Sequence, residues 1–381
     1  MGNLYLGTSG WSYDDWIGIL YDSKEKMLST YWDYFNTVEI NSTFYSYPKR
    51  SFILYLSRFA PPDFVFTAKL PKEITHTLKL NPSKGVAEKL SLFLDLMLPL
   101  KESGHLGPIL IQLPPEGPQK LPHFEDFLAL LDSNFMWSVE FRDTEWLTSS
   151  VFRLFEKYNI AYCIVDEPLL PPKIEITSRF SYIRWHGRGK APWYYYLYHE
   201  SELKEWVPRV NEILNSTDVV YAYFNNHFRG FAVINALQFL QLLGKATPNQ
   251  LTLLKEIDEK LKKPRLLTQK LPKNKEFSEV ELLLLKLVEL RRFERGKTIS
   301  DDLVTFTELT SERISGTIKN YEFLIDVKGR RLNHNCDDWK KRVQQKKLCK
   351  HMVKVFLLMP KSISIAILRD IIEHYDSWIF E

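Results

Sequence analysis

Eight short apolar runs, most of them separated by helical patterns, constrain the fold of this chain more than any other feature of its sequence. They lie at 3–9, 37–43, 64–70, 107–113, 137–142, 161–166, 181–187 and 219–226. Segments between them, such as 85–104 and 150–159, carry apolar residues at the i, i+3, i+4 spacing of an amphipathic helix. Strands that alternate with helices pair in parallel, so eight such units predict an α/β fold, a closed (β/α)8 TIM-type barrel. A doubly wound open sheet is the alternative, but GTSGW stands where its glycine-rich phosphate loop would be.

Polar and charged residues gather near the carboxyl ends of these runs. Side chains two apart on a strand share a face, so several of these residues form same-face pairs. A buried charge is costly unless it is paired or functional, and the carboxyl-terminal mouth of a barrel is where catalytic residues are found. Salt bridges that cap the barrel core are the structural alternative. The predicted catalytic residues are Glu39, Asn41, Lys69, Glu140, Arg142, Asp166, Arg184, His186 and Asn225.

Six segments also carry a resemblance to a known family. They are LGTSGWSYDDWIG, FNTVEINSTFYSYP, FTAKLPKEITH, GPILIQLPP, WSVEFRDTEW and YAYFNNHFRGFAVINA. In this order they closely resemble the signature segments of the domain-of-unknown-function family 72 (YecE-like), over roughly residues 3–244. The resemblance implies a TIM-type barrel whose polar mouth is an active site. It implies no particular reaction.

The residue types at the predicted mouth favour an anionic substrate. Guanidinium groups bind phosphate bidentately and histidine shuttles protons near neutral pH, so we expect Arg142 and Arg184 to hold a phosphate and His186 to act as general acid and base. Glu140 or Asp166 would be its partner. Lys69, tuned by a nearby carboxylate, is a candidate base or imine-forming nucleophile. One Mg²⁺ or Mn²⁺ ion held by carboxylates is a further option, whereas a multinuclear zinc site needs more histidines than the mouth offers.

Charge is unevenly distributed along the chain. The net charge is +4, but residues 245–381 hold 28 Lys+Arg and 20 Asp+Glu, while residues 1–244 hold 23 and 27. This asymmetry favours a polyanionic partner for the C-terminal part, with a solvated basic surface as the alternative. The predicted parts are the barrel at 1–244, a basic linker at 245–276, a helical connector at 277–315 and a zinc module at 316–381. Within them, a capping box predicts a leucine-rich helix that begins at Ser278 and ends near Gly296, and 310–336 predicts two strands with VKGRR as their turn.

Four residues near the C-terminus have the types and spacing of a metal site. His334-x-Cys336 is followed after twelve residues by Cys349-x-His351, and two thiolates with two imidazoles make a closed tetrahedral zinc site. The set, together with Trp339 and the apolar helix after CKH, resembles the SWIM zinc finger. That family has CxC…CxH, so His334 stands at the first cysteine position. Free cysteines that lie near histidines by chance are the alternative.

A basic run crowds the loop between the two ligand pairs and suggests the partner. It would bind phosphates without sequence preference and with marked salt dependence. The SWIM resemblance implies contact with DNA or with protein, and local composition favours DNA or RNA. The predicted nucleic-acid-binding residues are Lys340, Lys341, Arg342, Lys346, Lys347 and Lys350.

The predicted function is therefore a nucleic-acid-processing or DNA-repair enzyme, of endonuclease/phosphodiesterase or glycosylase/lyase type. One alternative is an enzyme on a small phosphorylated or sugar substrate whose zinc module docks a protein partner; another is a non-catalytic nucleic-acid-binding protein. Three cysteines suit a reducing compartment, the start shows no secretion signal, and no apolar run is long enough for a membrane helix. A cytoplasmic location follows as an expectation.

Overall fold

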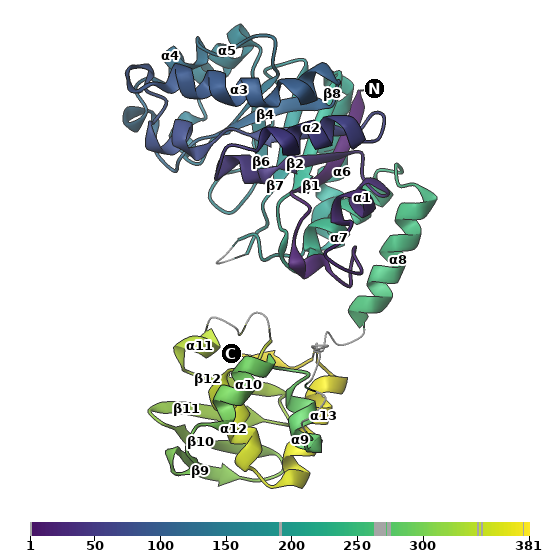
Figure 1. The fold of residues 1–381 in the computed structure, drawn as a ribbon, viewed down its shortest axis with the longest axis vertical. Helices are drawn as coiled ribbons and strands as arrows, with labels where there is room; N and C mark the ends of the chain where they lie inside the picture. The colour runs from purple at the N-terminus through teal and green to yellow at the C-terminus, as the bar shows by residue number, and fades with distance from the viewer. Residues whose placement is uncertain are drawn as a thin grey trace. The chain divides into compact units, whose positions relative to one another are not determined.

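The chain forms two compact units, Met1–Asp258 and Glu259–Glu381, which are described separately (Figure 1). The computed structural model describes residues 2–189, 193–262, 272, 276–340, 343, 346–375 and 377–381. Within these ranges no helix has the length and apolar character needed to cross a membrane.

The first unit is a closed barrel of eight strands in sequence order, each parallel to its neighbours. The predicted α/β barrel is thereby confirmed. Several strands end earlier than their apolar runs, so Asn41, Arg142, His186 and Asn225 belong to the loops that follow. The strands are β1 (Asn3–Ser9), β2 (Thr37–Ile40), β3 (Val65–Lys69), β4 (Leu106–Gln112), β5 (Trp137–Glu140), β6 (Ala161–Asp166), β7 (Phe180–Trp185) and β8 (Val219–Phe224).

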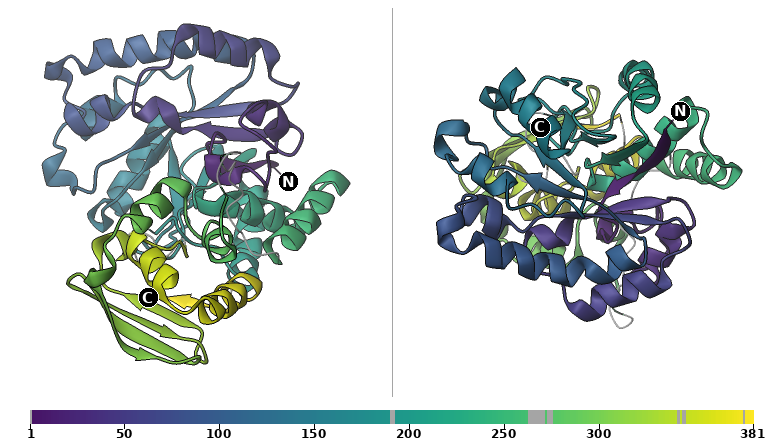
Figure 2. Two further views of the ribbon diagram at one scale, coloured as in Figure 1. Left: turned by 60° about the horizontal axis from the view of Figure 1, so that its bottom comes forward. Right: turned by 90° about the horizontal axis from the view of Figure 1, so that it is seen from above.

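Helices follow most strands and lie outside them, as Figure 2 shows from above. α5 illustrates the cause: Phe152 and Phe155 are buried on one face, the Thr148 side chain accepts from the Val151 N–H at its start, and Asn159 ends it in the left-handed conformation. β6 and β7 are joined by residues 167–179, a segment without a helix. The helices are α1 (Met27–Trp32), α2 (Arg50–Phe59), α3 (Val86–Glu102), α4 (Phe124–Leu128), α5 (Ser149–Tyr158), α6 (Glu200–Ser216), α7 (Phe231–Leu242) and α8 (Pro248–Lys262).

A layer of tyrosines and threonines fills the middle of the barrel and supports the polar mouth. The Tyr223 hydroxyl lies 2.7 Å from Thr37 Oγ1, and the Tyr182 hydroxyl lies 2.9 Å from Thr67 Oγ1. Tyr182 also donates to Glu39 Oε2 at 2.7 Å. The first charged side chains of the mouth therefore rest on a hydrogen-bonded layer that leaves them little freedom.

The predicted linker at 245–276 begins with helix α8. Gln250 donates to the backbone carbonyl of Tyr34 at 2.6 Å, and Leu253 and Ile257 are buried. Through these contacts the start of α8 is packed into the barrel unit. Residues 263–271 and 273–275 of the predicted linker lie outside the described residues.

The second unit is a five-stranded sheet with helices on one face, as Figures 1 and 2 show. The strand order is β13-β12-β11-β10-β9. Along the strands buried residues alternate with exposed ones, and the buried set joins a single core with the helices. The strands are β9 (Val304–Leu309), β10 (Arg313–Ile318), β11 (Tyr321–Asp326), β12 (Arg331–His334) and β13 (Ile379–Phe380); the helices are α9 (Glu279–Leu284), α10 (Leu290–Lys297), α11 (Asp337–Lys340), α12 (Lys350–Leu358) and α13 (Lys361–Glu373).

Two local expectations for this unit need correction. Residues 310–336 form three strands, since a tight turn at Lys319 with φ +55° separates β10 from β11, and VKGRR turns the chain from β11 to β12. The leucine-rich helix begins with the predicted Ser278–Glu281 capping box but is divided into α9 and α10. Leu284, Leu285, Leu287 and Val288 are all buried. The chain leaves the helix after Leu284 and enters the next one at Leu290, with these apolar side chains packed in the core of the unit.

Candidate functional site

Arg184 is the centre of the barrel mouth. Its guanidinium is 1% exposed and bridges two carboxylates that are fully buried: NH2 lies 2.7 Å from Glu39 Oε1, and NH1 lies 2.5 Å from Glu140 Oε2. NH2 also faces Ser9 Oγ at 3.4 Å. Burial works against the charged forms, but the paired charges prevail: Arg142 and Arg184 hold the pKa of Glu140 well below its usual range. This ion network joins residues from β1, β2, β5 and β7.

A second arginine extends the network toward solvent. Arg142 NH2 lies 2.5 Å from Glu140 Oε1, and its NH1 lies 2.5 Å from Glu167 Oε2. The Arg142 side chain is 16% exposed and the Glu167 side chain is fully buried. Burial raises the pKa of Glu167 to about 7 in spite of Arg142. Its second oxygen, Oε1, is buried without a hydrogen-bond partner in the described part of the chain.

Lys69 places a buried amine at the end of β3. Nζ donates to Gln112 Oε1 at 2.7 Å and lies 3.8 Å from the centre of the Phe44 ring. Lys69 is 7% exposed. Burial, followed by the charge of Arg184, lowers the pKa of Lys69 to about 7. Gln112 Oε1 also accepts from Arg142 NH2 at 3.3 Å, so Lys69 and Glu167 stand at two ends of one hydrogen-bonded chain.

His186 is buried, and its surroundings keep it neutral. The Asn225 amide donates to Nδ1 at 2.8 Å, which leaves the proton on Nε2, 3.3 Å from Glu140 Oε1. Burial and the charge of Arg142 lower the pKa of His186 to about 3. Nearby His76 is also neutral at physiological pH, because burial and Lys69 lower its pKa to about 4. A neutral, doubly engaged imidazole is better suited to hold Glu140 in place than to exchange protons near pH 7.

Two of the nine predicted residues lie apart from this network. Asp166 faces the helices: it binds Arg188 through both oxygens, at 2.9 and 2.7 Å, and accepts from Trp206 Nε1 of α6 at 2.6 Å. Asn41 begins the turn after β2 and lies beside Tyr13, whose hydroxyl donates to the Ser9 carbonyl at 2.7 Å. The structure brings the other seven together and adds Glu167, Gln112 and Ser9.

Glu167 follows β6 directly. The alternation of inward and outward side chains along this strand could have predicted that Glu167 belongs to the mouth. Cys163 and Val165 point into the barrel core, whereas Tyr162 packs against Phe152 of α5. Side chains two apart share a face, so residue 167 points inward like Cys163 and Val165, whereas Asp166 points outward. Cys163 is a buried member of the barrel core, as expected.

The predicted metal ligands converge in the second unit. One ligand atom each from His334, Cys336, Cys349 and His351 lies within 4.8 Å of the others, and all four residues are buried. A tetrahedral ion at ordinary zinc–ligand distances holds such atoms roughly 3.3–3.8 Å apart, so a small closure completes the site. In the described ranges this is the one group of at least three such residues close enough to share an ion.

Neighbouring groups orient these ligands. His334 Nδ1 donates to the Glu322 carbonyl at 2.6 Å, which points Nε2 at the cluster. The backbone N–H of Trp339 lies 3.2 Å from Cys336 Sγ, and that of Met352 lies 3.5 Å from Cys349 Sγ, as Cys349 caps α12. Hydrogen bonds, first from the Cys349 thiol, lower the pKa of Cys336 well below its usual range. The donor set fits a metal ion that prefers thiolate and imidazole.

Residues 5–259 match a protein family described as protein of unknown function DUF72. The chain belongs to the DUF72 family. The match ends one residue beyond the first unit, so family membership concerns the barrel. YunF of Bacillus subtilis, a UPF0759 protein, is 26% identical over 271 residues, which are 63% of this chain and 94% of YunF. YecE of Escherichia coli K12 is 32% identical over 144 residues, 38% of this chain and 50% of YecE.

Solved DUF72 structures show the same barrel. A DUF72 family protein from Thermotoga maritima is 33% identical, with a TM-score of 0.57 over 64% of this chain and 99% of its own. One from Enterococcus faecalis, 22% identical with a TM-score of 0.57, covers 64% of this chain and 96% of its own and shares the fold. The family name assigns no reaction, so the chemistry must be inferred from the mouth.

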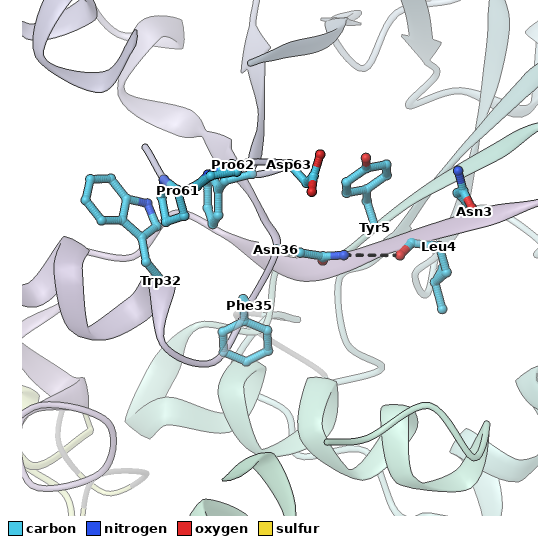
Figure 3. A pocket seen from close by; sticks show the side chains of 10 residues that line it. Asn3, Leu4, Tyr5, Trp32, Phe35, Asn36, Pro61, Pro62 and Asp63 are labelled. Atoms are coloured by element: carbon cyan, nitrogen blue, oxygen red, sulfur yellow. Dashed lines mark hydrogen bonds between the residues drawn. The ribbon is translucent and has the colours of Figure 1, made fainter. Parts of the chain in front are cut away.

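A pocket of this DUF72 barrel lies at the end opposite to the mouth. It measures about 460 Å³ and opens where β1, β2 and β3 begin, beside Asn3, Asn36 and Phe64. Figure 3 shows Trp32 on one side of it and the Asn36 amide donating to the Leu4 carbonyl, at 3.4 Å. Since catalysis in barrels takes place at the carboxyl ends of the strands, this pocket is not the candidate active site.

The predicted nucleic-acid-binding residues are partly engaged within the protein. Lys346 Nζ donates to the Tyr375 carbonyl at 3.0 Å, and Lys347 pairs with Glu289 at 3.1 Å. Lys340 is exposed and Lys350 is half-buried at the start of α12. The other two, Lys341 and Arg342, lie outside the described residues.

Proposed function

We propose that the barrel is a lyase-type enzyme in which Lys69 attacks an aldehyde carbon of an anionic substrate, and that this substrate is nucleic acid carrying an abasic sugar. The observation that supports it is the buried Lys69 amine, at the catalytic end of a barrel strand, with a pKa of about 7. An amine that is half neutral at pH 7 is a nucleophile without further activation. Chemistry of this kind needs no metal at the mouth.

The proposed reaction moves protons between groups that the network already connects. The neutral amine adds to the aldehyde carbon, and the resulting carbinolamine loses its hydroxyl as water to give an imine. Removal of a C2′ proton then expels the 3′ phosphate by β-elimination, and water releases the unsaturated aldehyde from Lys69. Glu167, whose pKa is also about 7, would donate the proton to the departing hydroxyl and accept the C2′ proton.

The expected roles of the other mouth residues are revised accordingly. Both terminal nitrogens of Arg184 are engaged by Glu39 and Glu140 and the side chain is buried, so it is proposed to hold these carboxylates and not a phosphate. Arg142 is the more exposed guanidinium and is proposed to face the phosphate. His186 is proposed as a positioning residue for Glu140. A Mg²⁺ or Mn²⁺ ion at these carboxylates stays a prediction, and it would have to displace the arginines.

The second unit is proposed to hold one structural zinc ion and to bind DNA or RNA. Two thiolates and two imidazoles are the donor set of structural zinc, and the variant HxC…CxH set followed by Trp339 supports a SWIM-like module. Lys340, which is exposed, and Lys350, which is half-buried, are the residues of the basic run that are proposed to face the nucleic acid. An acidic protein partner remains the alternative for this surface. The cysteine content supports a cytoplasmic location.

Borohydride trapping tests the chemistry. The full-length protein is incubated with an abasic oligonucleotide, and sodium cyanoborohydride reduces any imine to a stable secondary amine that mass spectrometry locates. We expect the adduct on Lys69 and none in Lys69→Met, while Lys84→Met, an exposed lysine of the loop between β3 and α3, behaves as wild type. An adduct with glyceraldehyde 3-phosphate but not with the oligonucleotide would favour the small-substrate alternative. No adduct with either would refute the proposal and leave the non-catalytic binding protein.

A further inference from the structure

A pocket beside Lys69 indicates which part of the substrate binds next to the reacting aldehyde. We propose that this pocket is a nucleotide subsite, which stacks one flat base on Tyr45 and receives the adjoining phosphate at Lys72. The inference rests on the proposed function and deepens it.

The pocket lies between the loops that follow β2 and β3. It measures about 250 Å³, and its walls include Phe44, Tyr45, Tyr47, Pro71 and Lys72. Small-molecule pockets begin at about 300 Å³, so this one has room for a single ring system with its sugar and not for two stacked bases. Rings and a proline supply flat, apolar walls, which suit a planar ligand.

Tyr45 is the most exposed large hydrophobic residue in the described part of the chain, with 71% of its surface open to solvent. Its ring meets the edge of Phe44, with centroids 5.3 Å apart and an interplanar angle of 86°. An aromatic ring that is exposed to this extent can serve as a stacking platform, since every nucleobase has a π-face.

The charge at the pocket is positive. Lys72 Nζ lies 5.7 Å from the centre of the Tyr45 ring. The nearby Glu73 carboxylate is already paired with Lys89, at 3.0 Å, so it does not neutralise Lys72. A cation over one face of the Tyr45 ring leaves the other face for a base, and it matches a base that carries a phosphate on its sugar.

The pocket adjoins the proposed nucleophile through one ring. Phe44 lines the pocket and also carries Lys69 Nζ 3.8 Å from its centre. The wall formed by Glu73–Thr77 is a single π-helical turn, followed by Lys79 and Leu80, both at positive φ, +50° and +60°. Lys79 bonds both oxygens of Glu116, at 2.9 and 2.8 Å. Such irregular backbone, tied down by an ion pair, fixes the pocket at a defined place beside Lys69.

Binding measurements on the full-length protein test this subsite. Fluorescence anisotropy with a labelled single-stranded pentamer, and calorimetry with dAMP, distinguish a nucleotide within a strand from a free one. We expect Tyr45→Ala to weaken the binding of at least one of these probes about 5- to 100-fold and Tyr45→Phe to restore it. Lys72→Met should reduce the slope of log affinity against log salt for the pentamer by about 0.7.

Tyr55→Ala is the matched control, because Tyr55 is 44% exposed on α2 and stacks only on Phe59 among the described rings. It should bind both probes as wild type does. Unchanged affinity in Tyr45→Ala, or no binding of either probe by the wild type, would overturn the subsite. Trapping of a small aldehyde on Lys69 is a separate measurement. If no adduct forms, the lyase chemistry is refuted, whereas nucleotide binding that depends on Tyr45 would still establish the subsite.

Discussion

Lys69→Met is the substitution that tests the central feature of the mouth. An ordinary lysine with a pKa of 10.5 is about 0.03% neutral at pH 7, whereas Lys69, with a pKa of about 7, is about half neutral. Burial thus raises the fraction of nucleophilic amine roughly 1,600-fold. Methionine keeps the length and removes the amine, and Gln112 keeps its hydrogen bond from Arg142. We expect the rate of imine formation to rise with pH up to about 7, to fall above it as Glu167 loses its proton, and to vanish in the variant.

The same substitution has a consequence for stability whose sign follows from linkage. Because the folded pKa lies below the unfolded one, the unfolded chain binds the extra proton between pH 7 and 10.5, and the folded state gains stability as pH rises through that window. At 1.36 kcal/mol for each pH unit, Lys69 costs about 5 kcal/mol at pH 6 and about 2 kcal/mol at pH 9. We therefore expect Lys69→Met to stabilise the barrel by about 3 kcal/mol more at pH 6 than at pH 9.

Hydrogen exchange of barrel peptides in urea, followed at both pH values, measures this difference for the barrel unit alone. The comparison between the two pH values cancels any constant gain or loss of packing by methionine. Lys72→Met, at an exposed position three residues on, is the control and should show no such difference. A stability difference between wild type and Lys69→Met that is the same at pH 6 and pH 9 would refute the lowered pKa, and with it the case for a neutral nucleophile.

Three further substitutions probe the rest of the two units. Glu167→Gln cannot donate or accept a proton. Because the pKa of Glu167 is about 7, the wild-type rate should fall above pH 7 as Glu167 loses its proton. We expect the variant to react more slowly at every pH and to show no such fall. Arg184→Met leaves the buried Glu39 carboxylate without its charged partner and Glu140 with Arg142 alone, and it should lower the free energy of unfolding by about 3–5 kcal/mol in urea titrations. Arg188→Met, at a 30% exposed side chain, should lower it by less. Cys349→Ala should reduce bound zinc, measured by mass spectrometry of the native protein, from one ion to none and lower the melting temperature of the second unit; unchanged zinc content would contradict the site.

The sequence predicted the barrel because strand and helix periodicities are local, and it predicted the metal ligands because their spacing is short. Alternation along β6 would also have selected Glu167 over Asp166, had the inward parity of Cys163 been applied beyond the end of the strand. What local patterns cannot supply is the pairing of side chains from distant strands. Arg184 meets Glu39 across 145 positions, and this contact supports a structural role for the arginine.

The basic run shows the same limit in the second unit. Six cations within eleven positions predict a phosphate-binding surface, yet Lys347 is paired with Glu289, 58 positions away, and Lys346 with the carbonyl of Tyr375, 29 positions away. Charge counts along a sequence treat every lysine as free for a partner. The fold uses two of these lysines within the unit, so the density of charge overstates the surface available to a polyanion.

Charge balance at the mouth explains why Lys69 and Glu167 are the groups left for chemistry. Glu39 and Glu140 are matched by Arg184 and Arg142, and His186 is neutral. Since these pairs are buried and closely hydrogen-bonded, changing the protonation of any member leaves an unpaired charge in a dry site. Lys69 and Glu167 differ from them: the mouth has the same net charge whether both are ionised or both are neutral. A proton that moves from Lys69 to Glu167 therefore leaves the Glu39–Arg184 and Glu140–Arg142 pairs intact and gives up only the Arg142–Glu167 pair. An imine-forming enzyme requires such an exchange between its nucleophile and its acid.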